Sequence, residues 1–336
     1  MPRIAVAIPC YNERLTVEKV VSDFREALPS ATVYVYDNNS TDGTAEAARR
    51  AGAVVRRVTR QGKGNVVRRM FADIDADIYV MVDGDSTYPA QRVAALVAPV
   101  AGGEADMVVG SRAEAYASTH FRRFHRFGNE LIRKLINVLF RSSLTDVLSG
   151  FRCFSRRFVK GIGVLSEGFE IETELTLQAL DKNFTVMEVP IDYYDRPKGS
   201  TSKLNTYLDG LLIMQTILSV FKDYKPLKCF SSVAALAFGA AGLFGSIPIH
   251  DFVTTGGVTH QATAVLAAST ALIAVLSLLT GVILDSIARR NREMYQLLVD
   301  HVIKGGEESS TPARIRPRPH ARPAALAAAP AQTALR

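Results

Sequence analysis

Short apolar runs alternate with segments of helical periodicity over the first 110 residues of the chain. The apolar runs predict strands, at Arg3–Ile8, Thr32–Tyr36, Ala53–Val58, Ile78–Val82 and Asp106–Val109. The segments between them have apolar residues three and four positions apart and predict helices, near Arg14–Leu28, Thr44–Ala51, Asn65–Ala72 and Ala90–Val100. This alternation predicts an α/β fold, in which helices cover both faces of a mostly parallel sheet.

Two long apolar segments follow near the C-terminus, Cys229–Ile249 and Ala262–Leu284. Each is about as long as the ~20 residues that a helix needs to cross a bilayer. The alternative is a pair of core helices in a soluble protein, but the remaining tail is too small to surround them. The pattern favours a transmembrane hairpin. It divides the chain into a domain at 1–225, a hairpin at 226–290 and a basic tail at 291–336, with disorder expected from about Lys304.

The charged residues around the hairpin predict its orientation. Basic residues lie on the outer flank of each segment, namely Lys222, Lys225, Lys228, Arg289, Arg290 and Arg292. The stretch His250–Gln261 between the segments has no Lys or Arg. By the positive-inside rule, both ends of the hairpin and both termini are expected in the cytoplasm. The first strand begins without a signal-peptide pattern, which leads to the same expectation for the domain.

Two segments before the hairpin have patterns that suit the membrane surface. In the first, at about 120–141, apolar residues recur at helical spacing, at Phe121, Phe124, Phe127, Leu131, Leu135 and Leu139. Such a helix either packs this face on the domain or lies among the headgroups, and the hairpin downstream favours the second. The other segment, about 204–224, carries Asp209 and Gln215. Polar groups at mid-bilayer are costly, so we expect an interfacial helix rather than a third span.

Composition narrows the class of partners. The 336 residues are 48% hydrophobic and carry a formal charge of +7. Because Lys and Arg concentrate near the apolar segments, this charge favours anionic lipid and argues against nucleic acid. The three cysteines lack metal-ligand spacing, so neither a disulfide framework nor a zinc site is predicted. Gly239, Gly242 and Gly245 suit close helix packing, either within the hairpin or between copies in a homo-oligomer.

Candidate chemistry begins with Asp83 and Asp85, which directly follow an apolar run. Two carboxylates on one loop can hold Mg²⁺ or Mn²⁺ together with substrate phosphates, because these ions favour oxygen ligands and take few from the protein. Acidic loop pairs are common, so the pair alone is a weak signal. Whether the pair forms a metal site depends on the other polar motifs of the chain.

Three more polar loops follow other predicted strands: Ile8–Glu13 closes the first, Asp37–Thr44 closes the second and Gly62–Asn65 follows the third. The C-terminal ends of parallel strands share one edge of a sheet, so all four loops are expected to converge on one cleft. This cleft suits a nucleotide, with acids for base and ribose and Lys63 for phosphate oxygens. Taken singly, the second loop is equally well an ordinary Asx turn and the third a plain loop. Together, the four favour a site.

These motifs carry a family resemblance. IPCYNE, YDNNSTDGT, GKGN and VDGD occur in this order within about the first 90 residues, and Ser149–Phe154, Gly168–Glu172 and Arg196–Lys203 follow. The ordered set resembles inverting family 2 glycosyltransferases with the Rossmann-like GT-A fold. The later motifs are similar to those of dolichyl-phosphate mannose synthases and bacterial polyprenyl-phosphate glycosyltransferases. The resemblance covers about residues 3–225, and the two-span hairpin matches the bacterial type.

The resemblance implies a donor site at the start of the chain. The nucleoside would be contacted by Pro9, Tyr11, Glu13 and Asp37. Asp83 and Asp85 would hold Mg²⁺ or Mn²⁺ and the donor diphosphate. Many relatives have a Gln two residues after the second Asp as a further metal contact. Here Thr87 stands at that position, which leaves the third ligand open, with water as one candidate.

The resemblance also implies an acceptor site built from basic residues. The acceptor phosphate would be bound by Arg112, Arg152, Arg196 and Lys203, with a hydrogen bond from Ser200. Guanidinium groups suit phosphate because they offer paired donors. Glu172 would position the sugar or the acceptor.

The expected activity is metal-dependent, inverting transfer of a sugar from a nucleotide sugar to polyprenyl phosphate at the cytoplasmic membrane face. A UDP-sugar is favoured and GDP-mannose is the alternative. Two other functions remain open at this stage. A processive polysaccharide synthase of this fold usually carries a Gln-x-x-Arg-Trp motif, and this chain has no Trp. A non-catalytic nucleotide-sugar-binding adaptor would be expected to lose the metal-binding acids, which are both present.

Overall fold

The computed structural model describes residues 2–112, 123–168, 170–197, 219 and 221–310. Its centre is a seven-stranded sheet with the order β3-β2-β1-β4-β6-β5-β7. The strands are β1 Ile4–Cys10, β2 Thr32–Asp37, β3 Val54–Arg57, β4 Ile78–Met81, β5 Met107–Ser111, β6 Arg152–Ser155 and β7 Val186–Pro190. Strand β6 is antiparallel to both β4 and β5, whereas the other pairings are parallel. The mostly parallel α/β sheet predicted from the sequence is confirmed.

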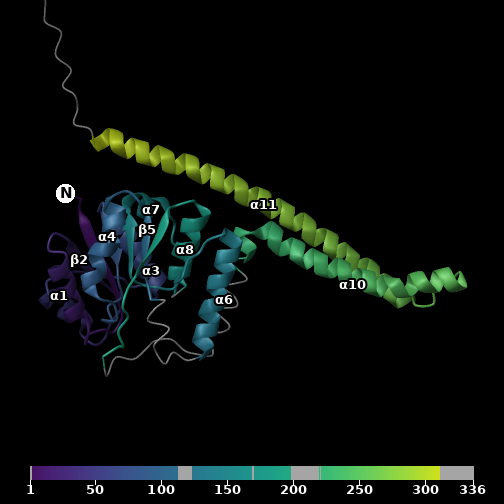
Figure 1. Cartoon of the computed structure of the whole chain (residues 1–336), viewed down its shortest axis with the longest axis horizontal. Helices are drawn as coiled ribbons and strands as arrows, with labels where there is room; N and C mark the ends of the chain where they lie inside the picture. Colours follow the sequence, from purple (N-terminus) through teal and green to yellow (C-terminus); the bar gives the residue numbers. More distant parts are fainter. Residues whose placement is uncertain (1, 113–122, 169, 198–218, 220, 311–336) are drawn as a thin grey trace, which may run out of the picture.

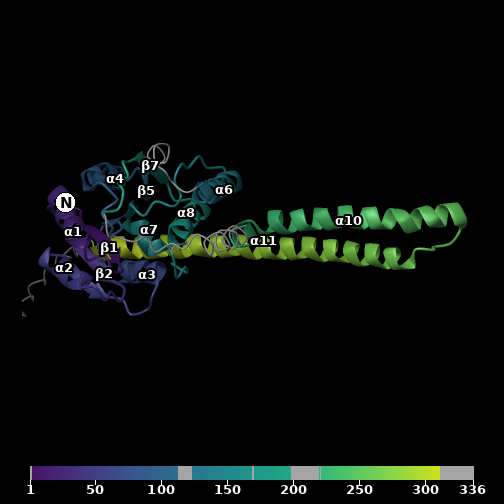
Figure 2. The ribbon, with the colours of Figure 1, turned by 90° about the horizontal axis from the view of Figure 1, so that it is seen from below.

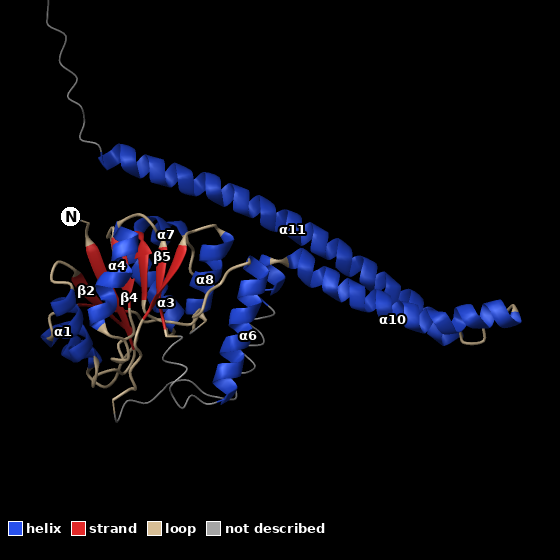
Figure 3. Ribbon diagram, viewed as in Figure 1, coloured by secondary structure: helices blue, strands red, loops and turns tan. Residues whose placement is uncertain are grey.

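Helices cover both faces of the sheet (Figure 3). One face packs on α1 Val17–Ala27, α2 Thr44–Arg50, the 3₁₀ turn η1 Ala90–Arg92 and α4 Val93–Ala101. The other face packs on α3 Lys63–Asp73, α7 Arg156–Gly161 and α8 Ile171–Asp181. Strand β1 shows why: Val6 and Ile8 point into the first core and Ala5 and Ala7 into the second, as the two-residue period of a strand requires.

Helix α6, Arg123–Phe140, contains the described part of the first predicted interfacial helix. Ile132, Ile136 and Leu139 are buried in a small apolar cluster with Leu177 of α8. The helix therefore packs an apolar face on the domain, while Val138 stays 73% exposed. Figures 1 and 2 show α6 on the side from which the hairpin leaves, with its axis across that of the hairpin. Placement of α6 at the membrane surface stays a prediction.

The C-terminal hairpin consists of α10, Pro226–Thr255, and α11, Gln261–Ser310. Pro226 suits the first turn of α10, and Gly256 ends it in the left-handed conformation. Both helices are long and apolar enough to cross a membrane, and only 17% and 11% of their most apolar windows are buried. Side chains such as Leu236 and Leu243 face outward, unlike those of core helices. A Cβ built on Gly245 would lie 3.6 Å from that of Ala267 of α11, an ordinary contact distance, so this position faces the other helix of the hairpin.

Several details differ from the sequence predictions. Strands β6 and β7 and helices α7 and α8 were not predicted, because their short segments lack a clear period. Helix α11 runs to Ser310, so the disorder predicted from Lys304 is wrong up to that residue. The predictions for Phe121, for most of the segment Leu204–Phe221 and for the tail at 311–336 lie outside the described residues.

Candidate functional site

The loops after β1, β2 and β4 meet at one edge of the sheet, because these three strands are neighbours. Cys10 at the end of β1 lies beside Asp37 at the end of β2, and Ala7 lies beside Met81 of β4. The Thr16 hydroxyl donates a hydrogen bond of 2.6 Å to the Gly84 carbonyl and so ties the first loop to the acidic loop. The convergence predicted from the sequence is present in the structure.

Three polar residues of these loops have left-handed backbone conformations, Asn12, Asn39 and Ser86, with φ of 54°, 64° and 62°. Asparagine tolerates this region, but serine adopts it less readily. Backbone strain of this kind gathers where surrounding contacts hold a loop in a functional shape. Ser86 lies directly after Asp85 and therefore belongs to the turn that aims the second carboxylate.

Lys63 lies between two carboxylates that are far apart in the sequence. Its Nζ is 2.5 Å from Oδ1 of Asp83 and also forms an ion pair with Glu172 of α8. The three side chains are 10%, 26% and 6% exposed, respectively. Burial lowers the pKa of Lys63, but the two carboxylates outweigh that effect, so its pKa lies above the ordinary value. The lysine is a fixed positive charge beside Asp83.

Asp85 faces a different cation. Nη2 of Arg196 lies 2.7 Å from Oδ2 of Asp85, and Nη1 lies 3.7 Å from Oε1 of Glu13. The other Asp85 oxygen accepts hydrogen bonds from the Thr87 hydroxyl at 2.7 Å and the Thr87 amide at 3.2 Å. Thr87 is buried. It orients Asp85, which is a physical reason for a threonine at the position where many relatives have Gln.

Asp37 is buried at the end of β2 and is only partly satisfied. Its Oδ2 accepts from the amide of Ser40 at 3.3 Å, while Oδ1 is the one buried side-chain oxygen or nitrogen without a hydrogen-bond partner among the described residues. A buried acceptor without a partner is costly. The neighbouring Asn38 amide, in contrast, bonds to the carbonyls of Val58 and Arg60. Asp37 therefore offers an acceptor to a ligand that brings a donor.

Arg112 forms a buried pair with Asp146. Its Nε lies 2.7 Å from Oδ2 and its Nη2 3.1 Å from Oδ1, and the guanidinium lies over the ring of Tyr193. Burial raises the pKa of Asp146, but the Arg112 charge outweighs it, so this pKa lies below the ordinary value. The two planar groups hold each other in a bidentate arrangement.

The structure places Arg152 differently from the prediction. Its side chain is fully buried. Nε and Nη2 donate to the carbonyls of Ser149 and Val147, both at 2.8 Å, and Nη1 donates to the Thr176 hydroxyl at 2.9 Å. A guanidinium engaged in this way inside the protein does not present its donors to an acceptor phosphate. We interpret Arg152 instead as the group that ties the loop before β6 to α8.

This loop reaches the acidic motif at Gly150. A Cβ atom built on Gly150 would lie 2.3 Å from Oδ2 of Asp83, and one built on Gly84 would lie 2.6 Å from Sγ of Cys10. Each glycine is required by close packing. The amide of Gly150 is held by the Tyr88 hydroxyl at 2.9 Å. Beyond the motif itself, no pattern in the sequence indicated these contacts, and none indicated a role for Asp146 or Tyr88 in the site.

The remaining predicted residues divide into two groups. Pro9 lies in β1, and Tyr11 follows it with 39% exposure at the same edge of the sheet. Ser200 and Lys203 lie outside the described residues. Arg196, the first residue of their motif, is described, and its contact with Asp85 brings the start of the basic segment to the acidic loop.

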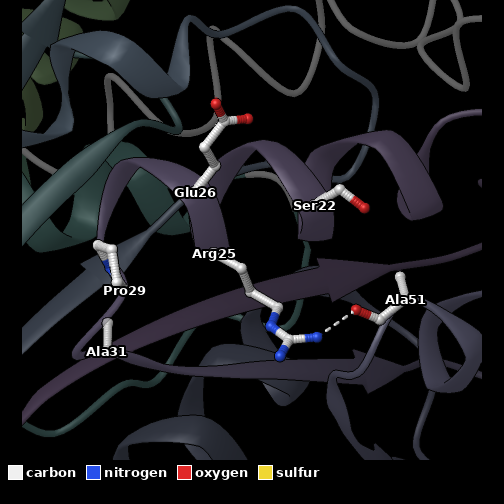
Figure 4. A pocket seen from close by; sticks show the side chains of 6 residues that line it. All are labelled: Ser22, Arg25, Glu26, Pro29, Ala31 and Ala51. Atoms are coloured by element: carbon white, nitrogen blue, oxygen red, sulfur yellow. Dashed lines mark hydrogen bonds between the residues drawn. The ribbon is translucent and has the colours of Figure 1, made fainter.

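A pocket of about 480 Å³ lies elsewhere on the domain (Figure 4). Its lining consists of Ser22, Arg25, Glu26, Pro29, Ala31 and Ala51. Ser22, Arg25 and Glu26 belong to the C-terminal half of α1, Pro29 and Ala31 precede β2, and Ala51 precedes β3, so the pocket is at the edge of the sheet opposite to the carboxylates. Arg25 is bound to the Ala51 carbonyl at 2.8 Å. The pocket is no part of the candidate site.

The site and the fold agree with comparisons to known proteins. The family model for glycosyl transferase family 2 matches residues 5–163. The chain is 34% identical over 86% of its length to glycosyltransferase AglJ of Haloferax volcanii, covering 95% of that protein. The chain belongs to this glycosyltransferase family. The resemblance inferred from the motifs is thereby confirmed.

Two further relatives are informative. The chain is 28% identical to the dolichyl-phosphate hexose transferase of Haloferax volcanii, covering 65% of this chain and 93% of that one. The structure of glucosyl-3-phosphoglycerate synthase from Mycobacterium tuberculosis, in complex with Mn²⁺, UDP and phosphoglyceric acid, superposes with a TM-score of 0.52 at 25% identity. That match covers 66% of this chain and 78% of the synthase. Family and GT-A fold are therefore established for this glycosyltransferase.

Asp83 and Asp85 suit a divalent cation by their chemistry. They supply carboxylate oxygens from one loop, and Mg²⁺ commonly takes only one or two such groups before substrate phosphates and water complete its shell. Among the described residues no group of three or more His, Cys, Asp or Glu side chains is placed to hold a metal. Lys63 and Arg196 instead neutralise the two carboxylates in the structure.

Proposed function

We propose that this glycosyltransferase transfers a sugar, with inversion, from a nucleoside diphosphate sugar to polyprenyl phosphate at the cytoplasmic face of a membrane. The ion pair of Asp85 with Arg196 carries the proposal, because it joins the donor half of the family motif to the basic segment that precedes the hairpin. The dolichyl-phosphate hexose transferase among the relatives supports this acceptor class.

The described residues have distinct tasks in this reaction. Asp37 accepts a hydrogen bond from the nucleoside through its unpaired Oδ1. A divalent cation held by Asp83 and Asp85 would neutralise the diphosphate of the donor. Arg196 brings positive charge for the acceptor phosphate, whereas the charge of Arg112 is balanced by its buried partner Asp146. Lys63 sets the charge balance of Asp83 and Glu172.

The acceptor needs little activation. A phosphate monoester has a second pKa near ~6 and is largely dianionic at neutral pH. One of its oxygens attacks the anomeric carbon, a new carbon–oxygen bond forms, and the bond to the donor diphosphate breaks, releasing a nucleoside diphosphate. Catalysis then consists mainly of holding the two anions in line and stabilising charge. Glu172 is engaged by Lys63 and positions groups rather than removing a proton.

The membrane part of the proposal depends on the hairpin. Its two exposed apolar helices would anchor the domain in the bilayer that holds the lipid acceptor. The charges that flank the hairpin favour a cytoplasmic domain, which is the side of the membrane where nucleotide sugars are made. UDP is the favoured nucleotide, because the Mycobacterium tuberculosis synthase with the same fold binds it. GDP-mannose remains the alternative.

A panel of radiolabelled nucleotide sugars tests the proposal. The purified chain is incubated with polyprenyl phosphate, Mg²⁺ or Mn²⁺ and each labelled donor in turn. We expect one of the donors to give a labelled product that partitions into organic solvent. Anomeric configuration of that product, read by NMR, tests inversion. A labelled polymer without labelled lipid would favour a polysaccharide synthase, and donor binding without turnover an adaptor.

A further inference from the structure

Helix α8 connects the candidate site to the membrane hairpin. At its first turn, Glu172 forms the ion pair with Lys63, which in turn binds Asp83. At its last residue, Asp181 lies 3.1 Å from Nη1 of Arg292 of α11. One rigid helix of about 15 Å therefore has one end in the site and the other on the hairpin.

The middle of α8 is equally well fixed. Thr176 accepts from Arg152, which holds the loop that carries Gly150 against Asp83. Leu177 packs in the apolar cluster with α6, to which Phe221 and Tyr224 also contribute. Because α8 is buried along most of its length, a movement at Asp181 cannot be absorbed within the helix.

The hairpin needs a second attachment to hold the domain in one orientation. The chain passes from domain to hairpin at Lys225, whose φ of −136° and ψ of 58° are not helical and interrupt the helix before Pro226. Lys225 lies over the ring of Phe140 at 4.8 Å, and Tyr224 packs on the same ring. A single break of this kind permits rotation. Arg292 belongs to the other helix of the hairpin, so its contact with Asp181 attaches α11 to the domain as well, beside the break, where Lys225 is close enough to be affected by both charges.

The stability of α8 gives no reason for an aspartate at its last position, residue 181. A carboxylate at the C-terminal end of a helix is unfavourable toward the helix dipole. Its side chain is 13% exposed and that of Arg292 is 31% exposed, so the pair is partly shielded from water. The residue is better accounted for by its partner on α11 than by its own helix.

We propose that Asp181 and Arg292 are positioning residues, which hold the catalytic cleft at a fixed height and angle to the bilayer so that a membrane-bound acceptor phosphate reaches it. The inference rests on the proposed transfer to polyprenyl phosphate. It predicts that the ion pair matters for an acceptor anchored in a bilayer and not for one that diffuses freely in water.

The test compares two acceptors in proteoliposomes that contain the full chain. One acceptor is long-chain polyprenyl phosphate in the bilayer, and the other is a short water-soluble prenyl phosphate. We expect Arg292→Asp to lower kcat/KM about tenfold with the long acceptor, because it removes a pair and places two carboxylates together, and less than about twofold with the short one. The double variant Asp181→Arg/Arg292→Asp is expected to recover to within about threefold of the wild type, since it restores the pair reversed.

Arg290→Asp is the matched control. It removes the same charge from α11 two residues earlier, at a position with no ion pair recorded among the described residues, and is expected to stay within about twofold of the wild type on both acceptors. The inference is overturned if Arg292→Asp matches Arg290→Asp, if both acceptors suffer equally, or if the reversed pair brings no recovery. Absence of product from the wild type with either acceptor would instead overturn the proposed function.

Discussion

Asp85 and Arg196 form an ion pair, with Nη2 of the arginine 2.7 Å from Oδ2 of the carboxylate. The arginine thus occupies the oxygen that a divalent cation would take, and it begins the basic segment assigned to the acceptor. A cation bound at Asp85 would compete with Arg196 for this oxygen. The proposed function therefore predicts that donor binding and acceptor binding are linked through this one side chain.

Replacement of Arg196 by alanine is expected to weaken acceptor binding without weakening metal binding. The KM for polyprenyl phosphate should rise about tenfold or more, since a charge-assisted contact is lost. Mn²⁺ affinity with the nucleotide should stay the same or increase, because a competing cation is gone. Initial rates and isothermal titration measure the two effects. Arg92→Ala, which removes an exposed pair with Asp192, is the control, and weaker Mn²⁺ binding in Arg196→Ala would contradict the link.

Gly150→Ala is expected to inactivate the enzyme without unfolding it. The added Cβ would lie 2.3 Å from Oδ2 of Asp83, so the carboxylate must move. A displacement of about 1 Å in a site can cost about 100-fold in rate, and we expect a loss of at least about tenfold in kcat. Gly163→Ala, where nothing lies within 4 Å of the new Cβ, should keep wild-type rates. Equal rates for both variants would show that Asp83 is not held at this position.

Asp37→Ala should weaken donor binding while leaving the fold intact. The carboxylate has a buried oxygen without a partner, so its removal costs little stability. Donor affinity is expected to fall about 10- to 100-fold, because the ligand then loses a charged acceptor.

Asp42→Ala in the same loop is expected to lower the stability of the fold and to leave donor binding unchanged. Its carboxylate holds the amides of Thr44 and Arg14, so about 1 kcal/mol of folding stability is lost while donor affinity changes little. Thermal unfolding and titration with a nucleoside diphosphate distinguish the two variants. A donor affinity unchanged in Asp37→Ala would exclude the assigned contact.

Acidification should weaken the Arg112–Asp146 pair. The pKa of Asp146 is lower in the folded state than its ordinary value, so the stabilisation is present above about pH 4 and is lost as pH falls through the folded-state pKa. At neutral pH, Asp146→Asn leaves a buried guanidinium without its counter-charge and should cost about 3 kcal/mol. When unfolding temperatures are measured from pH 7 to 3, the difference between Asp146→Asn and the wild type should become smaller below about pH 4. A gap that is independent of pH would contradict the pairing.

The sequence predicted most of what local pattern controls. The strand ends at Asp37 and Asp83 follow from apolar runs and turn residues, and topology alone brings them to one edge. The contacts between Lys63 and Glu172 and between Gly150 and Asp83 join residues far apart in the chain, and no periodicity encodes them. Arg152 shows the limit of motif transfer, because its position in a motif gave no information on its burial.

The most direct test of the central claim is the metal- and Asp85-dependence of lipid labelling. Wild-type chain and Asp85→Asn, both verified as folded by their unfolding temperatures, are incubated with labelled nucleotide sugar and polyprenyl phosphate, with Mg²⁺ or with EDTA. The account predicts labelled polyprenyl-phosphate sugar from the wild type with Mg²⁺, and a loss of at least about 100-fold with EDTA or with Asp85→Asn. Labelled lipid at near wild-type rates from Asp85→Asn would contradict it.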